Sequence, residues 1–208
     1  MNKQGKANNP TPGRRIALET LVRVELDQAY ANRVLHALFL REQPRAEVRA
    51  EATELVYGTL RHLTRYDYLL AQLLRQPLRK LSPQIRNILR MALFEIESGN
   101  CPAYAAVDQG VKLAKASGQA GLAKLVNGVL RTYARQGQKL SLPDFAREPK
   151  KHLIIAHSHP EWLIESWLER WSVDLVHRLV RSNNLPAPLS LRVNTFRTTR
   201  RDLISELM

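Results

Sequence analysis

The pattern of apolar residues in the first 137 positions constrains the fold of this chain more than any other feature. Apolar side chains recur three and four residues apart, as in an amphipathic helix, and no run there alternates apolar with polar residues as a half-buried strand does. Breaks at Pro44, Pro77 and Gly99 divide the pattern into short helices with short connections. Short connections favour neighbouring helices that pack close to antiparallel. We therefore expect an all-α helical bundle over residues 14–137.

The clearest of these helical patterns is the segment 122–135, which reads LAKLVNGVLRTYAR. Its apolar residues share one helix face: Leu122, Leu125, Val126, Val129, Leu130 and Tyr133. Its opposite face carries four basic or polar residues: Lys124, Asn127, Arg131 and Arg135. Gly128 lies beside this second group, where a glycine costs about 1 kcal/mol of helix stability relative to alanine. Either another helix or a ligand approaches the backbone at this glycine, or the face is an ordinary solvated one.

The rest of the chain divides into three parts. Residues 1–13 are polar and basic and are expected to form a flexible tail. Residues 138–151 form a polar, proline-containing linker. In residues 152–208 two amphipathic helices precede one alternating segment, 189–194 (LSLRVN), and a last helix spans 200–208. Because a single strand has no partner, we expect this part to be the start of a small α/β subdomain, with the chain ending inside that subdomain.

The charge balance points to a polyanionic partner. The chain has 32 Lys and Arg against 19 Asp and Glu, a net charge of +13. An excess of this size attracts nucleic acid, whose binding releases counterions from the phosphates. An anionic membrane is the rival partner, but no apolar run approaches the roughly 18 residues of a membrane-spanning helix, and the N-terminus has no secretory signal. We therefore expect no membrane partner and a cytoplasmic protein.

The residues that could carry catalysis or bind a metal do not form a recognisable site. Cys101 is the only cysteine, which excludes an intramolecular disulfide and any multi-cysteine zinc site. His152, His157 and His159 lie close together, but no cysteine or carboxylate cluster completes a metal site, so we interpret them as solvent-facing or capping histidines. Three tryptophans at helical spacing are expected in the core rather than stacked on bases: Trp162, Trp167 and Trp171. We expect no catalytic residue and no metal site.

Basic residues gather in several further groups. They are Arg14 with Arg15, Arg86 with Arg90, the group Arg75, Arg79 and Lys80, and the group Arg192, Arg197, Arg200 and Arg201. Any one group is an ordinary solvated face by itself. Taken with the net charge, they predict that at least one group contacts RNA or DNA.

Several short motifs carry a family resemblance. They are RRIA at 14–17, YGTLR at 57–61, IRNILRMALF at 85–94, Cys101-Pro102 before AAV at 105–107, LVNGVLR at 125–131, HPEWL at 159–163 and LRVNT at 191–195. Together they resemble the NusB-like N-terminal region of the Sun/Fmu (RsmB) family of 16S ribosomal RNA cytosine-5 methyltransferases. The motifs before residue 137 would also suit a free-standing NusB-type antitermination factor. The last two resemble the linker and pre-catalytic subdomain of the methyltransferases.

The resemblance implies RNA binding by the helical domain. At the matching positions it assigns this role to Arg14, Arg15, Asn127 and Arg131, and the charged face of segment 122–135 adds Lys124 and Arg135. The amide of Asn127 is equally suited to a structural role in which it bridges helix backbones. In the family a domain that binds S-adenosylmethionine and holds the catalytic cysteine follows this region. We find no glycine-rich cofactor loop and no Pro-Cys pair, so we expect neither cofactor nor methyl transfer in these residues.

The expected function is to position small-subunit ribosomal RNA so that a catalytic domain outside this chain can methylate a cytosine. The expected partner is therefore ribosomal RNA, and the helical domain could also mediate a homodimer. A NusB-type transcription antitermination factor that binds RNA is the first alternative. A helical scaffold that binds proteins is the second.

Overall fold

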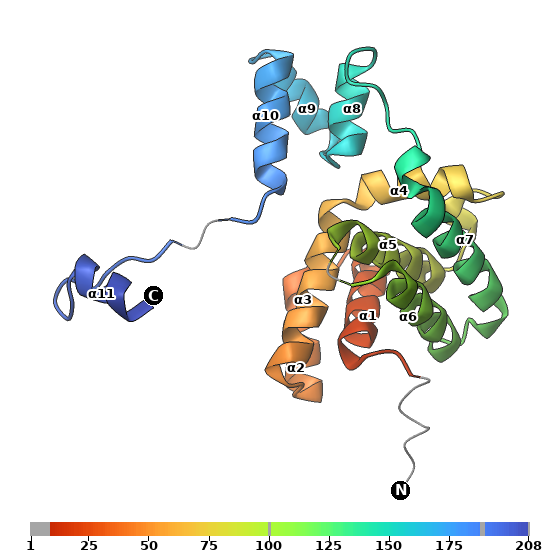
Figure 1. Ribbon diagram of the computed structural model, residues 1–208, viewed down its shortest axis with the longest axis horizontal. Helices are drawn as coiled ribbons and strands as arrows, with labels where there is room; N and C mark the ends of the chain where they lie inside the picture. The colour runs from red at the N-terminus through yellow and green to blue at the C-terminus, as the bar shows by residue number, and fades with distance from the viewer. Residues whose placement is uncertain (1–8, 100, 188–189, 208) are drawn as a thin grey trace, which may run out of the picture.

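The computed structural model describes residues 9–99, 101–187 and 190–207 (Figure 1). Within these ranges the chain forms eleven α-helices and no β-strand. The all-α bundle predicted from the helical periodicity is therefore confirmed. None of the helices in the described ranges combines the length and the apolar character needed to cross a bilayer.

Seven helices make up the first unit. They are α1 (Pro12–Asp27), α2 (Ala31–Glu42), α3 (Ala46–Arg61), α4 (Leu63–Leu73), α5 (Pro83–Ser98), α6 (Ala103–Ala116) and α7 (Ala123–Gln136). Three short 3-10 helices accompany them. Leu78–Lys80 follows α4, Ala120–Leu122 precedes α7, and Gly137–Lys139 follows α7. Helix α5 is central, because it packs against α1, α3, α4, α6 and α7 and buries residues on nearly all sides (Figure 1).

Side-chain caps fix where two of these helices begin. The hydroxyl of Thr11 accepts a hydrogen bond from the Arg14 backbone N–H at 3.4 Å, and Pro12 occupies the first turn of α1. Helix α1 therefore starts two residues earlier than predicted, inside the segment expected to be a flexible tail. Residues 1–8 of that predicted tail lie outside the described ranges. Ser82 caps α5 in the same way, through the Ile85 N–H at 3.4 Å.

Two glycines differ in what surrounds them. At Gly58 on α3, an added Cβ atom would lie 2.2 Å from Cζ of Phe94, so α3 meets the Phe94 ring of α5 only because this residue has no side chain. At Gly128 on α7, an added Cβ atom would have no neighbour within 4 Å. Among the described residues, no helix approaches the backbone there. Of the interpretations of Gly128, close helix packing is wrong, and approach of a ligand stays a prediction.

The second unit contains α8 (Pro149–Ala156), α9 (Glu161–Leu168) and α10 (Val173–Asn184). Its core has four fully buried residues: Leu153, Ile164, Val176 and Val180. Helix α8 packs against α4 of the first unit, and the Arg65 N–H donates to the Ser158 hydroxyl at 2.9 Å. The predicted linker 138–151 is therefore too long, because α8 begins at Pro149 within it.

Two expectations for the second half of the chain are wrong. Residues 190–194 form no strand, and Leu189 lies outside the described ranges. No other strand exists in the described residues to pair with this segment, and an unpaired strand is not stable. Trp162 and Trp171 are 69% and 43% exposed rather than buried, and only Trp167 packs against the small core. The predicted last helix is confirmed as α11 (Arg200–Leu207).

Candidate nucleic-acid interface

Helix α7 has the two faces that its sequence predicts. Its apolar face is buried in the main core through Val126, Val129, Leu130 and Tyr133. On the other face Lys124, Arg131 and Arg135 are exposed and Asn127 is half-buried. Because the core holds one face in place, the basic residues of the other face are presented together on a rigid helix.

A hollow of about 500 Å³ lies between α6 and α7, and we call it the α6/α7 groove. Its lining comes from both helices: Tyr104, Val107, Asp108, Val111, Asn127, Arg131, Ala134 and Arg135. Three of the predicted RNA-binding residues, Asn127, Arg131 and Arg135, therefore lie in one place. Lys124 lies one turn before Asn127 on the same helix.

The groove combines an aromatic ring, apolar side chains and cations. Tyr104 is 78% exposed, because it lies in the first turn of α6, where none of the described helices covers it. Asp108 is the one acidic residue among those lining the groove, and Lys112 pairs with it at 2.7 Å. The Asn127 amide forms no hydrogen bond to another described residue, so its proposed structural role finds no support. An aromatic face beside guanidinium groups suits a nucleobase and its phosphates.

Arg14 has a different environment from these groove residues. Its guanidinium donates to the carboxylates of Glu51 on α3 and Glu95 on α5, and its side chain is only 11% exposed. A further bond joins it to the Thr11 hydroxyl at 2.9 Å. Arg14 therefore ties three helices together rather than presenting a cation to RNA, contrary to the role that the resemblance implies. Arg15 is 55% exposed and pairs with Glu42 at the end of α2.

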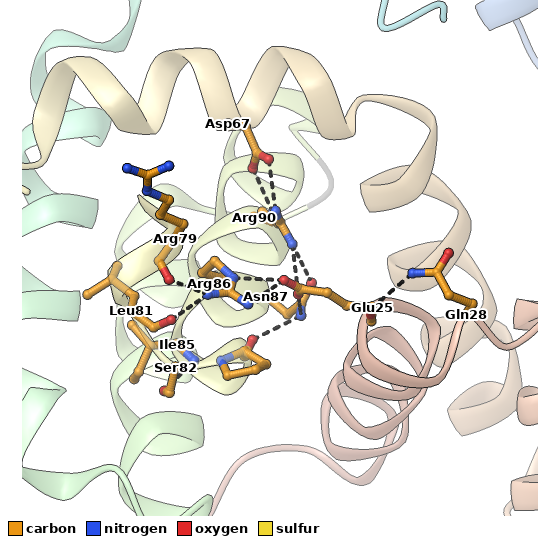
Figure 2. A network of polar contacts seen from close by, with 11 residues as sticks. Glu25, Gln28, Asp67, Arg79, Leu81, Ser82, Ile85, Arg86, Asn87 and Arg90 are labelled. Atoms are coloured by element: carbon orange, nitrogen blue, oxygen red, sulfur yellow. Dashed lines mark hydrogen bonds and ion pairs between the residues drawn. The ribbon is translucent and has the colours of Figure 1, made fainter. Parts of the chain in front are cut away.

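The basic pair Arg86 and Arg90 is also occupied within the fold (Figure 2). Arg90 donates through Nε and a terminal nitrogen to both oxygens of Asp67, at 2.7 and 2.8 Å, and also to Glu25 at 3.0 Å. Arg86 and Asn87 donate to the same Glu25 carboxylate at 2.8 and 2.7 Å. Figure 2 shows Glu25 of α1 at the centre of this network. Arg14, Arg86 and Arg90 therefore form ion pairs within the fold. Most of the positive charge in the two basic groups of α1 and α5 stabilises the protein.

These contacts shift the pKa of Glu25. Burial by itself would raise the pKa of this carboxyl, but the hydrogen bonds from Arg86 and Asn87 and the charge of Arg90 lower it below its usual range. Glu25 is therefore ionised in the folded protein at neutral pH, as the network requires.

The histidines do not group as the sequence suggested. His152 and His157 lie together, but the third member of the cluster is His177 of α10, and one ring nitrogen of each lies within 4.8 Å of the others. His159 instead donates from Nδ1 to the His157 carbonyl oxygen at 2.8 Å. Sequence reasoning missed His177 because it is 20 residues beyond His157 and carries no local motif.

Family models match two parts of the chain. The model of the NusB family matches residues 11–135, more than half of the chain. The model described as the Methyltr_RsmF/B-like, ferredoxin-like domain matches residues 159–208. Both matches agree with the resemblance that the motifs indicate.

The chain is also similar to curated and solved proteins. The probable ribosomal RNA small subunit methyltransferase B of Bacillus subtilis is 34% identical over 200 residues, which cover 95% of this chain and 44% of that protein. The probable ribosomal RNA small subunit methyltransferase B of Synechocystis is 37% identical over 161 residues, which cover 76% of this chain and 35% of that protein. The chain thus spans less than half the length of either relative.

Two solved structures share the fold of the first unit. NusB of T. maritima superposes with a TM-score of 0.54 at 24% identity, over 61% of this chain and 92% of that one. A chain in the crystal structure of a plectonemic RNA supercoil gives a TM-score of 0.57 at 21% identity, over 62% and 96%. At these identities the likeness shows the fold alone.

Proposed function

Because this chain belongs to the NusB family, we propose that its first unit binds ribosomal RNA on behalf of a small-subunit ribosomal RNA cytosine-5 methyltransferase. The observation that carries the proposal is the α6/α7 groove, where Asn127, Arg131 and Arg135 meet the exposed ring of Tyr104. The net charge of +13 supports it by attracting a polyanion from a distance.

Different residues of the groove would contact different parts of the RNA. Arg131 and Arg135 lie one turn apart on α7 and neutralise phosphates, which fixes the position of the RNA without reading its sequence. Tyr104 and the apolar floor at Val107 and Val111 offer a stacking surface for an unpaired base. Asn127, with an amide that both donates and accepts, supplies hydrogen bonds to a base edge or a ribose.

The second unit favours a methyltransferase over a free-standing antitermination factor. Residues 159–208 match a domain described for RsmF/B-like methyltransferases, and a NusB-type factor by itself would not need them. Methyl transfer, the cofactor S-adenosylmethionine and the catalytic cysteine would then belong to parts of the protein other than these 208 residues. The site of action would be the cytoplasm, where bacterial ribosomal RNA is made.

A charge reversal tests the RNA-binding role of the groove. Arg131→Glu should weaken binding to a fluorescently labelled small-subunit ribosomal RNA fragment by at least about tenfold, measured by anisotropy at fixed salt. Arg75→Glu is the matched control, because Arg75 is an exposed arginine outside the groove. Equal affinities for Arg131→Glu and the unmodified chain would favour the protein-binding scaffold instead.

A further inference from the structure

The second unit has a small apolar core for its size. Four fully buried side chains hold α8, α9 and α10 together, with partly buried neighbours such as Phe145 and Trp167. Small units with few buried residues often need a disulfide or a metal ion to stabilise them. The single cysteine, Cys101, lies in the first unit, so a disulfide within the second unit is impossible.

Three histidines meet at one edge of this core. His152 comes from α8, His157 from the residue that ends α8, and His177 from the middle of α10. Their ring centroids are 5.1 to 5.6 Å apart, and one nitrogen of each ring lies within 4.8 Å of the other two. Neither the family descriptions nor the RNA-binding role accounts for this grouping.

Hydrogen bonds around the cluster orient two of the three residues. Nδ1 of His152 lies 2.7 Å from the Pro143 carbonyl oxygen, so Nδ1 carries the proton and Nε2 has the lone pair. Such an outer hydrogen bond is the usual partner of a metal-binding histidine. The His157 carbonyl accepts from the Asn184 amide at 3.0 Å, which fixes the end of α8 against α10.

One nitrogen in the cluster lacks any partner. Nε2 of His157 is buried and makes no hydrogen bond in the described structure. Buried polar atoms in folded proteins nearly always have a partner, and an unpaired one calls for an explanation such as an ion. The ring centroid of Phe145 lies 4.3 Å from that of His177 and 5.3 Å from that of His152, so Phe145 packs against two members of the cluster.

From this arrangement we propose that His152, His157 and His177 bind a divalent first-row transition metal ion, with Zn²⁺ as the best fit. Neutral imidazoles suit such ions, and three histidines with a water in the fourth position form a common zinc geometry. In a tetrahedral site the ligand nitrogens are about 3.3 Å apart, given zinc–nitrogen bonds of about 2.0 Å, so modest ring rotations would close the site.

One cation and one anion lie beside the cluster. Arg181 lies near His157 and His177 and would repel it, while Asp174 attracts a positive charge at His177. A bound ion would join α8 to α10 and stabilise the second unit.

Zinc titration of the whole chain tests the proposal. Competition with a chromophoric chelator should give one Zn²⁺ per chain, and Co²⁺ should show the intense visible absorption of a tetrahedral site. His152→Gln and His177→Gln, which change two different helices, should each weaken Zn²⁺ affinity by about 100-fold or more. His36→Gln is the control, because His36 is an exposed histidine on α2.

Thermal unfolding provides a second readout that does not depend on RNA. Zn²⁺ should raise the unfolding temperature of the unmodified chain and of His36→Gln, but not of His177→Gln. The proposal is overturned if Zn²⁺ does not bind saturably, or if His177→Gln and His36→Gln bind it equally well. Failure here would leave the RNA-binding role untouched, since Arg131 and Arg135 lie on the other unit.

Discussion

The guanidinium of Arg14 on α1 and the carboxylate of Glu95 on α5 form an ion pair inside the bundle, with side chains only 11% and 9% exposed. Glu51 of α3 joins the same guanidinium. Burial raises the pKa of Glu95, and Arg14 opposes that rise by donating a hydrogen bond to the carboxylate. The pair therefore holds three helices in register, and its charge is not available to a partner.

Arg14→Ala should therefore lower stability and leave RNA affinity unchanged. Removing one member of a buried ion pair leaves the other charge uncompensated and costs about 3–5 kcal/mol. The free energy of unfolding in urea measures this loss. Arg15→Ala is the control, and it should cost less than about 1 kcal/mol because Arg15 is 55% exposed. If Arg14→Ala were fully stable but bound RNA poorly, the structural role assigned to Arg14 would be wrong.

Gly58→Ala and Gly128→Ala should shift stability in opposite directions. At Gly58 a methyl group would collide with Phe94, and overpacking costs about 1–3 kcal/mol, only partly offset by better helix propensity. At Gly128 the methyl group has free space, so the variant should gain about 1 kcal/mol. Thermal unfolding of the two variants checks the difference. Equal stabilisation of the two variants would contradict the close contact between Gly58 and Phe94.

The Glu25 network should make stability depend on pH. The folded pKa of Glu25 lies below its ordinary value of 4.5, so ionisation of this carboxyl stabilises the fold above that pH. The contribution is lost as the pH falls through the folded pKa. Glu25→Gln should therefore cost about 2 kcal/mol at neutral pH, and the difference from the unmodified chain should shrink in acid.

Urea unfolding between about pH 7 and pH 3 measures this dependence. Glu206→Gln serves as the control, because it removes an exposed carboxylate on α11 that lies outside the Glu25 network. A constant difference between Glu25→Gln and the unmodified chain across that range would contradict the assigned charge state of Glu25.

Tyr104 should contribute to RNA affinity through its ring. Stacking of a base on an aromatic side chain contributes about 1–3 kcal/mol, so Tyr104→Ala should weaken binding of an RNA with an unpaired loop, whereas Tyr104→Phe should not. Tyr30→Ala is the control, because Tyr30 is also an exposed tyrosine, at 70%, but caps the start of α2, outside the groove. Equal losses for Tyr104→Ala and Tyr30→Ala would argue against stacking in the groove.

Much of the helical fold follows from local sequence. The apolar face of α7 is set by residues within a few positions of each other, and it is as predicted. The Ser82 cap of α5 depends on residues that are equally close in the sequence. Helix α8 was missed because it has only eight residues, begins with Pro149 and carries two lysines before its apolar residues. The expected strand at 189–194 needs a second strand, and local alternation gives no information on that partner.

The candidate site was less predictable, because exposure depends on distant residues. Arg90 and Arg131 both occupy basic positions on amphipathic helices. Arg90 is buried, and Asp67 and Glu25, 23 and 65 residues away, receive its hydrogen bonds. Arg131, in contrast, forms no ion pair within the part of the chain that the structure describes, although Asp108 lines the same groove. The groove also includes the exposed ring of Tyr104, and whether that ring is covered depends on the packing of distant helices rather than on its neighbours in the sequence. The fold therefore selects which of the basic residues remain free to bind.

The salt dependence of RNA affinity tests whether the α6/α7 groove binds RNA. Arg131 and Arg135 are proposed to contact phosphates, and each such contact contributes about 1 to the slope of log affinity against log salt concentration. The double variant Arg131→Ala/Arg135→Ala should therefore lower this slope by about 2, while Arg75→Ala/Arg79→Ala should leave it unchanged. Identical slopes for the groove variant and the unmodified chain would contradict the claim that the α6/α7 groove binds RNA.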